Sequence, residues 1–241
     1  MKRMGVLGGI SPQATMDFEA RVHQVAQKLV PQHWNTGYPP MVVWYHRRLP
    51  IRRADDGRPI VPMEVDPQLV EAAAVLGRAV DFLVITCNSA HVGLRAITEA
   101  AGRPVLSMID LTVEEIARRG WRRPGAMGFG GPPRVYLDPL EQRGLRCATL
   151  DAALQTRLDA GIRAVMEGAE GAVERAAARD AVATLRGSGV DGVVLGCTEI
   201  PLLLGEASEA ADLVNPLALL AEAAVRFAME DAPVAAAAGV R

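Results

Sequence analysis

The sequence predicts an α/β protein made of two similar doubly wound parallel-sheet domains with a cleft between them. Short apolar runs alternate with longer helical patterns over the 241 residues, which is typical of parallel sheets covered by helices on both faces. The two halves also repeat each other. MGVLGGISP (4–12) resembles AMGFGGPPR (126–134), and an acidic residue, an apolar run and a cysteine follow one another in both DFLVITCNSAH (81–91) and DGVVLGCTEIP (191–201).

Seven elements are expected in the first half. They are a strand at 3–10, a helix at 12–29, a strand at 39–46, a helix at 67–79, a strand at 81–87, a helix at 91–101 and a strand at 103–109. Pro12 suits the start of its helix, where its missing N–H costs nothing. The Arg- and Pro-rich stretch 47–62 has no periodicity and is predicted to be a surface loop.

The second half repeats this order. It contains a helix at 110–120, strands at 125–131, 145–150, 192–197 and 212–216, a helix at 133–143, a helical region at 155–187, a short helix after 197 and a final helix to about residue 231. Asp110 is the expected cap of the first of these helices, and the last ten residues are expected to fray. We expect a first domain of residues 1–109 plus 212–241 and a second domain of residues 110–211.

Composition and charge argue against several classes of function. The net charge of −2 provides no basic field for nucleic acid or a membrane surface. The apolar run after the first residues is too short for a signal peptide, and no run is long enough to span a membrane. Three cysteines fit free thiols in a reducing compartment. We therefore expect a cytoplasmic protein with a small-molecule ligand and neither nucleic acid nor membrane as a partner.

Cys87 and Cys197 lie where ligands bind in such sheets, at the carboxyl ends of strands. They could be buried small hydrophobic residues, or zinc ligands together with His91, although the CxxC and CxxH spacings are missing. They could also be two thiols on opposite sides of a bound carbon, one removing a proton and one returning a proton. A thiol suits that task because its pKa of about 8.5 leaves both forms within reach. Cys147 has no matching partner and is expected to be structural.

Small polar residues surround the two cysteines. Asn88, Ser89 and Thr198 offer hydroxyl, amide and backbone N–H groups suited to a carboxylate, and the loop with Gly9 and Ser11 offers further N–H groups.

Two ionisable residues follow the cysteines. Glu199 is placed to tune or position Cys197, and His91 to do the same for Cys87. A hydrogen-bonded histidine that caps a helix is the alternative for His91.

The motifs GGISPQAT, CNSAH and LGCTEIPLLL together resemble the aspartate/glutamate racemase family, in order and spacing over nearly the whole chain. The resemblance implies two α/β domains related by a pseudo-twofold axis and a homodimer. It also implies racemisation of an amino acid without pyridoxal phosphate, other cofactor or metal, with Cys87 and Cys197 as acid and base.

The chain departs from this family in the residues that contact the substrate. Where the family has a Pro-Asp-Arg stretch whose arginine holds a carboxylate, LPIRRADDGRP makes Arg52 or Arg53 the equivalent.

Other departures concern the substrate side chain. Glu167 stands where members acting on acidic amino acids commonly have a lysine, Gly130 and Gly131 stand where hydroxyl residues are expected, and Asn215 stands where an aspartate is common.

The sequence therefore predicts a racemase or epimerase for aspartate, glutamate or a related amino acid. Three alternatives on the same fold stay open: a maleate isomerase, an arylmalonate decarboxylase, and a binding protein without catalysis.

Overall fold

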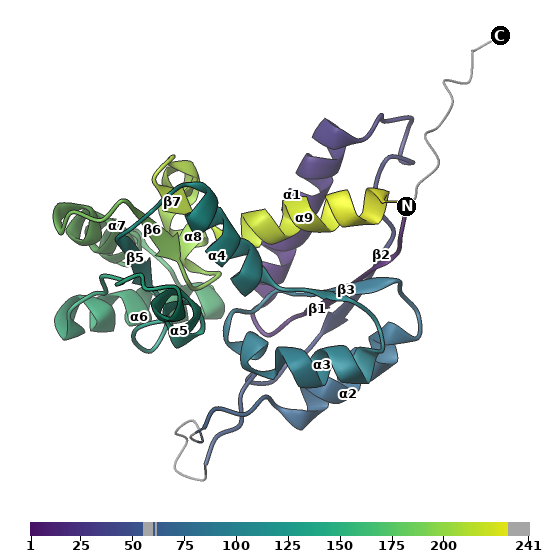
Figure 1. Cartoon of the computed structure of the whole chain (residues 1–241), viewed down its shortest axis with the longest axis horizontal. Coiled ribbons are helices and arrows are strands. Elements are labelled where there is room, and N and C mark those ends of the chain that lie inside the picture. Colours follow the sequence, from purple (N-terminus) through teal and green to yellow (C-terminus); the bar gives the residue numbers. More distant parts are fainter. Residues whose placement is uncertain (55–59, 61, 231–241) are drawn as a thin grey trace.

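The computed structural model describes residues 1–54, 60 and 62–230, and it consists of two α/β lobes (Figure 1). The first sheet has the order β2-β1-β3-β4 and the second has the order β5-β6-β7. Every strand pair in both sheets is parallel. The predicted α/β class with parallel sheets in two similar domains is confirmed.

The elements of the first lobe match the predicted order. They are β1 (Met4–Gly8), α1 (Pro12–Leu29), β2 (Met41–Tyr45), α2 (Pro67–Gly77), β3 (Phe82–Ile85), the 3-10 turn η1 (Ser89–Gly93), α3 (Leu94–Ala101) and β4 (Val105–Leu106).

The remaining elements build the second lobe and return to the first. They are α4 (Met108–Arg118), β5 (Pro124–Met127), α5 (Arg134–Gln142), α6 (Ala152–Glu167), α7 (Ala172–Gly187), β6 (Gly192–Leu195), α8 (Ile200–Leu204), the 3-10 turn η2 (Gly205–Glu209), β7 (Leu213–Val214) and α9 (Pro216–Met229).

Alternation along the strands explains why helices cover both faces of the first sheet. In β1 and β3, Val6 and Val84 pack in one apolar cluster with residues of α1 and α9. Their neighbours Leu7 and Ile85 point to the opposite face and pack with residues of α2 and α3. All four side chains are fully buried, as expected of parallel strands between two helical layers.

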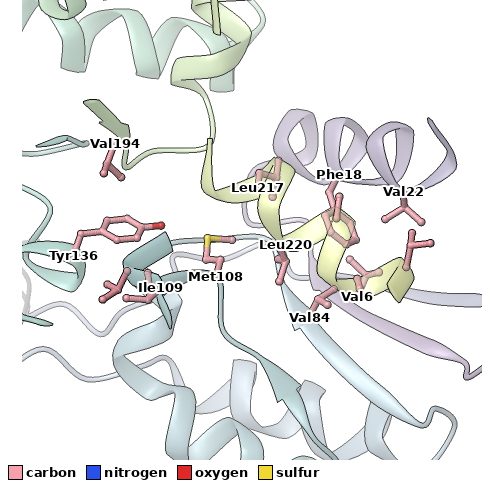
Figure 2. Packing of buried hydrophobic residues seen from close by; sticks show 14 of the residues in the cluster. Val6, Phe18, Val22, Val84, Met108, Ile109, Tyr136, Val194, Leu217 and Leu220 are labelled. Carbon is pink, nitrogen blue, oxygen red and sulfur yellow. The ribbon is translucent and has the colours of Figure 1, made fainter. Parts of the chain in front are cut away.

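One apolar cluster joins the two lobes. It contains Val6 and Phe18 of the first lobe, Tyr136 and Val194 of the second, and Met108 at the start of α4 between them (Figure 2). The opposite face of the second sheet packs on α6 and α7 in a separate cluster. The two sheets therefore share a continuous core on the sides that face the interlobe region.

Two predicted elements differ in the structure. The segment 145–150 is no strand. Only Ala148 pairs with Gly125, in a parallel bridge beside β5, with two backbone hydrogen bonds of 2.9 Å. This bridge occupies the place beside β5 that β2 occupies beside β1. The Leu145 N–H is taken by the Leu140 carbonyl at the end of α5, and Asp151 already caps α6, which leaves few residues between them to pair with β5.

The strand predicted at 103–109 is also shorter than expected. β4 contains two residues, and α4 begins at Met108 with Ser107 as its cap, because the Ser107 hydroxyl accepts from the Asp110 N–H. Asp110 lies inside the first turn instead, where its charge favours the helix dipole. The predicted fraying after residue 231 falls outside the described residues.

The domain division remains a proposal. α9 packs on α1 and α4, which favours placing the last helix with the first domain. β7 is hydrogen bonded to β6, so residues 213–214 belong to the second sheet and the return to the first domain begins at Asn215. Among the described residues, no helix is long and apolar enough to cross a membrane.

Candidate active site

Cys87 and Cys197 occupy equivalent places in the two lobes. β3 ends at Ile85 and β6 ends at Leu195, so each cysteine lies two residues beyond the carboxyl end of an internal strand. Charge on Cys87 raises the pKa of Cys197, which places the two thiols within electrostatic reach of each other. The fold thus brings together two residues that are 110 positions apart in the sequence.

Cys197 lies against a buried carboxylate. Its Sγ donates to Glu199 Oε2 over 2.9 Å, and the Thr198 hydroxyl donates to the same oxygen over 3.1 Å. Glu199 is only 1% exposed, and its second oxygen, Oε1, has no hydrogen-bond partner among the described residues. Burial, and then the charge of Glu199, raise the pKa of the Cys197 thiol well above its usual value.

Cys87 has a neutral neighbour at the same place. The Ser89 hydroxyl lies 3.4 Å from Cys87 Sγ, where Cys197 has a carboxylate. Burial raises the pKa of the Cys87 thiol, and hydrogen bonds from the Ser89 hydroxyl and the Ala90 N–H oppose that shift because they favour the thiolate. Both thiols are therefore protonated at neutral pH, and Cys87 is the better provided with donors for its charged form.

His91 connects the Cys87 loop to the next helix. Its Nδ1 lies 2.8 Å from the Cys87 carbonyl oxygen, to which it donates, and its Nε2 accepts from the Met108 N–H over 3.3 Å. Burial lowers the pKa of His91 to about 4, so the ring is neutral. Both nitrogens are occupied by backbone groups, which corresponds to the helix-capping alternative. Any support for Cys87 is therefore indirect, through the position of its backbone.

The loop after β1 is held by its own side chains. Gly9 has a φ of 75°, and a Cβ there would lie 2.3 Å from the Tyr45 Cα, so only glycine fits. The Gly9 N–H, expected to be free for a ligand, donates to Thr15 Oγ1 over 2.8 Å. Ser11 caps α1 by accepting from the Ala14 N–H. These groups shape the loop, and the Gly9 N–H is already satisfied.

Thr15 joins two loops of the candidate site. It belongs to the motif GGISPQAT but was not predicted as a site residue. It is fully buried, and its hydroxyl lies 3.0 Å from that of Thr86, the residue immediately before Cys87. The β1 loop and the Cys87 loop are therefore joined by a side-chain hydrogen bond. The spacing in GGISPQAT, where Thr15 follows Ser11 by one helical turn, is the sequence signal that could have identified this residue.

A buried tyrosine was missed entirely. Tyr136 of α5 is fully buried, and its hydroxyl donates to Asn88 Oδ1 across the interface between the lobes. Burial raises the pKa of Tyr136 well above its usual value, a hydrogen bond with the Thr112 side chain opposes the shift, and charge on Cys197 and Cys87 adds to it. The phenol is therefore within electrostatic reach of both thiols. Its ordinary helical context in the sequence carries no sign of this role.

Arg52 is already paired with an acidic side chain. Its guanidinium is half-exposed and forms an ion pair with Glu64 at 2.5 Å. Arg53 is also exposed. Arg47, which the sequence reasoning did not select, lies closer to the loop after β1. Its Nη1 is 3.5 Å from the Gly9 carbonyl oxygen, and its guanidinium stacks 4.8 Å from the centre of the Tyr45 ring.

The residues that depart from the family pattern lie on the second lobe. Gly130 and Gly131 have positive φ, and a Cβ at either position would meet open space. Glu167 is exposed at the last position of α6. The preceding residue, Met166, accepts a hydrogen bond through its carbonyl from Gln13 Nε2 at 3.4 Å. The end of α6 therefore lies beside the start of α1.

One further departure from the family pattern is Asn215, at the start of α9. Asn215 caps α9 through Oδ1, and its buried Nδ2 has no partner among the described residues. Within the same part of the chain, no cluster of three His, Cys, Asp or Glu side chains could hold a metal ion.

Comparisons with known proteins identify the family. The sequence model of the Asp/Glu/Hydantoin racemase family matches residues 7–224. The broad specificity amino-acid racemase RacX of Bacillus subtilis (strain 168) is 33% identical over 114 residues, which are 47% of this chain and 48% of that protein. The matched segment thus spans about half the length of this curated relative.

Solved structures show the same fold at low sequence identity. An aspartate racemase homologue from Pyrococcus horikoshii OT3 has a TM-score of 0.74 at 21% identity, covering 95% of this chain and 99% of that chain. The aspartate racemase of Picrophilus torridus has a TM-score of 0.73 at 19% identity, covering 95% and 94%. The allantoin racemase of Klebsiella pneumoniae has a TM-score of 0.58 at 18% identity, covering 95% and 87%.

The resemblance stated from GGISPQAT, CNSAH and LGCTEIPLLL is confirmed by the match over 7–224. Family members are racemases, which are isomerases. The chain belongs to the Asp/Glu/hydantoin racemase family.

Proposed function

We propose that the chain is an amino-acid racemase that works without pyridoxal phosphate and uses Cys87 and Cys197 as its acid and base. The observation that carries the proposal is the equivalent position of the two thiols, each two residues beyond a strand end and each sensitive to charge at the other lobe. Racemisation needs one proton acceptor and one proton donor on opposite faces of the same carbon. Two thiols from two related lobes supply that pair.

The proton transfers follow from the neighbours of each sulfur. In one direction Cys87 first loses its proton to solvent, its thiolate then takes the α-proton, and the Cys197 thiol gives its own proton to the opposite face. In the other direction Cys197 must first lose its proton. Glu199 Oε2 accepts the Cys197 hydrogen bond at 2.9 Å, so this carboxylate is placed to take the proton and leave a thiolate.

The α-ammonium group of the substrate fits the unpartnered oxygen of Glu199. Glu199 Oε1 is a buried acceptor without a partner, and a buried acceptor favours a charged donor. An ammonium group there would also lower the pKa of both thiols, because a nearby positive charge favours the thiolate. The substrate would thus create the base that reacts with it.

The α-carboxylate requires donors of its own in the site. Asn88, Ser89 and Thr198 remain the proposed amide, hydroxyl and backbone donors, and Gly9 and Ser11 the proposed loop. For the cation, Arg47 is supported by its contact with the Gly9 carbonyl. Arg52 would have to leave Glu64 to serve. The developing carbanion is stabilised when such donors are fixed in advance.

The substrate is proposed to be aspartate, glutamate or a related amino acid. Broad specificity in the relative from Bacillus subtilis favours a tolerant pocket. Glu167 would disfavour a second carboxylate if its charge reaches the substrate, since like charges close together cost free energy.

A racemisation assay in deuterium oxide tests the function. Each of aspartate, glutamate, alanine and lysine, as single enantiomers, is incubated with the protein, and optical rotation and deuterium at Cα are followed. The proposal requires both signals with at least one amino acid, and the protein should turn over neither maleate nor an arylmalonate. Deuterium in none of a full panel of amino acids, or turnover of maleate, would sink the proposal.

The charge argument is tested by Glu167→Lys. We expect kcat/KM for aspartate and glutamate to rise by roughly tenfold relative to alanine, because a repulsive charge becomes an attractive one. Glu114→Lys, which makes the same change on the exposed face of α4, is the matched control. An equal effect of both variants would show that Glu167 lies outside the site.

Assembly and location also stay proposals. The family resemblance favours a homodimer, and the three cysteines favour a reducing compartment, the cytoplasm. Sedimentation at the mass of a single chain would contradict the dimer.

A further inference from the structure

The hydroxyl of Tyr136 is a polar group in an apolar place. The ring belongs to the cluster that joins the lobes, where Met108, Ile109 and Val194 surround it (Figure 2). Figure 2 shows the hydroxyl oxygen directed toward Met108, away from the second sheet. A phenylalanine would fill the same space, so packing alone does not call for the hydroxyl. A buried hydroxyl is tolerated when it has a hydrogen-bond partner.

That partner belongs to the other lobe and is the residue next to Cys87. Tyr136 Oη donates to Asn88 Oδ1, and both side chains are buried. An amide has one carbonyl and one NH₂ group. Because the carbonyl of Asn88 faces Tyr136, its NH₂ group faces the other way. No described residue accepts a hydrogen bond from that NH₂ group, so it remains available to a ligand.

We propose that Tyr136 is a positioning residue. It orients the Asn88 amide toward the substrate carboxylate, and it holds the Cys87 loop of the first lobe against the second lobe, which carries Cys197. The proposal rests on the racemase function for its catalytic part. Its structural part, the coupling of Tyr136 to the Cys87 loop, does not depend on which substrate is used.

A hydrogen bond between the lobes matters because it sets the distance between the two thiols. Cys87 and Cys197 come from different lobes, and their separation must match one bound carbon for proton transfer to succeed. Thr15 and His91 fix the Cys87 loop within the first lobe. Tyr136 is the described residue of the second lobe whose side chain donates to that loop. It therefore sets the loop relative to Cys197, which the other two cannot do.

Cysteine alkylation tests the coupling without any substrate. Rates of iodoacetamide modification at Cys87, Cys197 and Cys147 are measured by peptide mass spectrometry for wild type, Tyr136→Phe, Asn88→Ala and the double variant. Cys147 lies outside the site, which makes it an internal reference. We expect Tyr136→Phe to speed modification of Cys87 at least threefold, because the loop opens more often, and to leave Cys147 unchanged. The double variant should be no faster than Asn88→Ala.

Tyr38→Phe is the matched control, since it also removes a hydrogen-bonded tyrosine hydroxyl, one that accepts from Gln27 Nε2 on the first lobe. It should change none of the three rates. An unchanged Cys87 rate in Tyr136→Phe would overturn the proposal, and so would an equal increase at all three cysteines, which means general loosening. Additive effects of the two site substitutions would also overturn it, since Tyr136 would then act independently of Asn88.

Racemisation kinetics separate this proposal from the proposed function. In an active protein, Tyr136→Phe should raise KM about tenfold and lower kcat less, because the loss is in carboxylate binding. A fall in kcat alone would contradict the role through Asn88. If wild type exchanges no α-proton, the racemase proposal and the catalytic part of this one fail, and the alkylation rates still decide whether Tyr136 holds the Cys87 loop.

Discussion

The loops after β3 and β6 have the same backbone placement and different chemistry. In the first lobe Cys87 is followed at the second position by Ser89 and at the fourth by His91. In the second lobe Cys197 is followed at the same positions by Glu199 and Pro201. The sulfur of Cys87 thus has a hydroxyl at 3.4 Å, whereas the sulfur of Cys197 has a carboxylate at 2.9 Å.

This difference shows that a duplicated fold need not give two equivalent bases. A hydroxyl can donate to a thiolate, while a carboxylate can only accept from a thiol. Both thiols therefore bear a proton in the protein without substrate, and Cys87 is the one whose neighbours favour the thiolate. In the proposed mechanism, the two directions of racemisation therefore begin with a thiol in different surroundings, even though the strands that carry the thiols match.

Removing either thiol should have the largest effect on racemisation. In Cys87→Ala or Cys197→Ala, racemisation should fall by roughly 10³-fold or more, because a positioned acid or base typically contributes that much. Exchange of the α-proton of a single enantiomer should survive, and the surviving enantiomer should differ between the two variants. Stereospecific deuterium incorporation measures it. Full racemisation by either variant would rule out the paired mechanism.

His91, four residues after Cys87, should make the stability of the protein sensitive to acid. Burial lowers the pKa of His91 to about 4, whereas the unfolded chain has the ordinary value of about 6.5. The stability that the neutral ring contributes is complete above pH 6.5 and is lost as the pH falls toward 4, because the unfolded state then binds the proton. The free energy of unfolding should drop by about 3 kcal/mol between pH 7.5 and pH 4.

Urea unfolding at several pH values measures this slope. His91→Gln should be less stable at pH 7.5 and should lose most of the dependence on pH. His33→Gln, at an exposed loop position, should keep it. A slope that is the same in both variants would show that other groups cause the acid sensitivity.

Glu199→Gln changes the residue two positions after Cys197, and it should have the smallest of these effects. The amide keeps an acceptor for Cys197 and removes the charge that raises the pKa of that thiol. The pH at which Cys197 becomes reactive should therefore fall by about one unit, a typical effect of a nearby like charge. The shift at Cys87 should be smaller, since its sulfur has Ser89 and not Glu199 as its hydrogen-bond partner. Alkylation rates against pH, read separately for each cysteine, decide between these outcomes.

Much of the fold could be predicted from local sequence patterns. The apolar runs around Val84 and Val194 and the repeated cysteine motifs located both central strands, because a buried parallel strand is an apolar run bounded by polar residues. Boundaries were less accessible. Ser107 competes with Asp110 as a cap, and only the position of β4 decides between them.

The site was predictable where its residues lie next to the cysteines in sequence. Glu199 and Ser89 contact the sulfurs because each lies only two residues along the chain from its cysteine. Tyr136 was not predictable, since its partner Asn88 lies 48 residues away in the other lobe. Arg47 was missed for a related reason. Its contact with Gly9 depends on the parallel pairing of β1 and β2, which the sequence pattern does not specify residue by residue.

The continuous apolar cluster through Phe18, Met108 and Val194 also determines how the protein loses its structure. A protein with two separate cores can melt in two steps, but here each lobe would expose the shared face if the other unfolded. We therefore expect one cooperative transition in calorimetry, with equal calorimetric and van't Hoff enthalpies. A chain cut between β4 and β5 would yield two fragments that fold only in each other's presence.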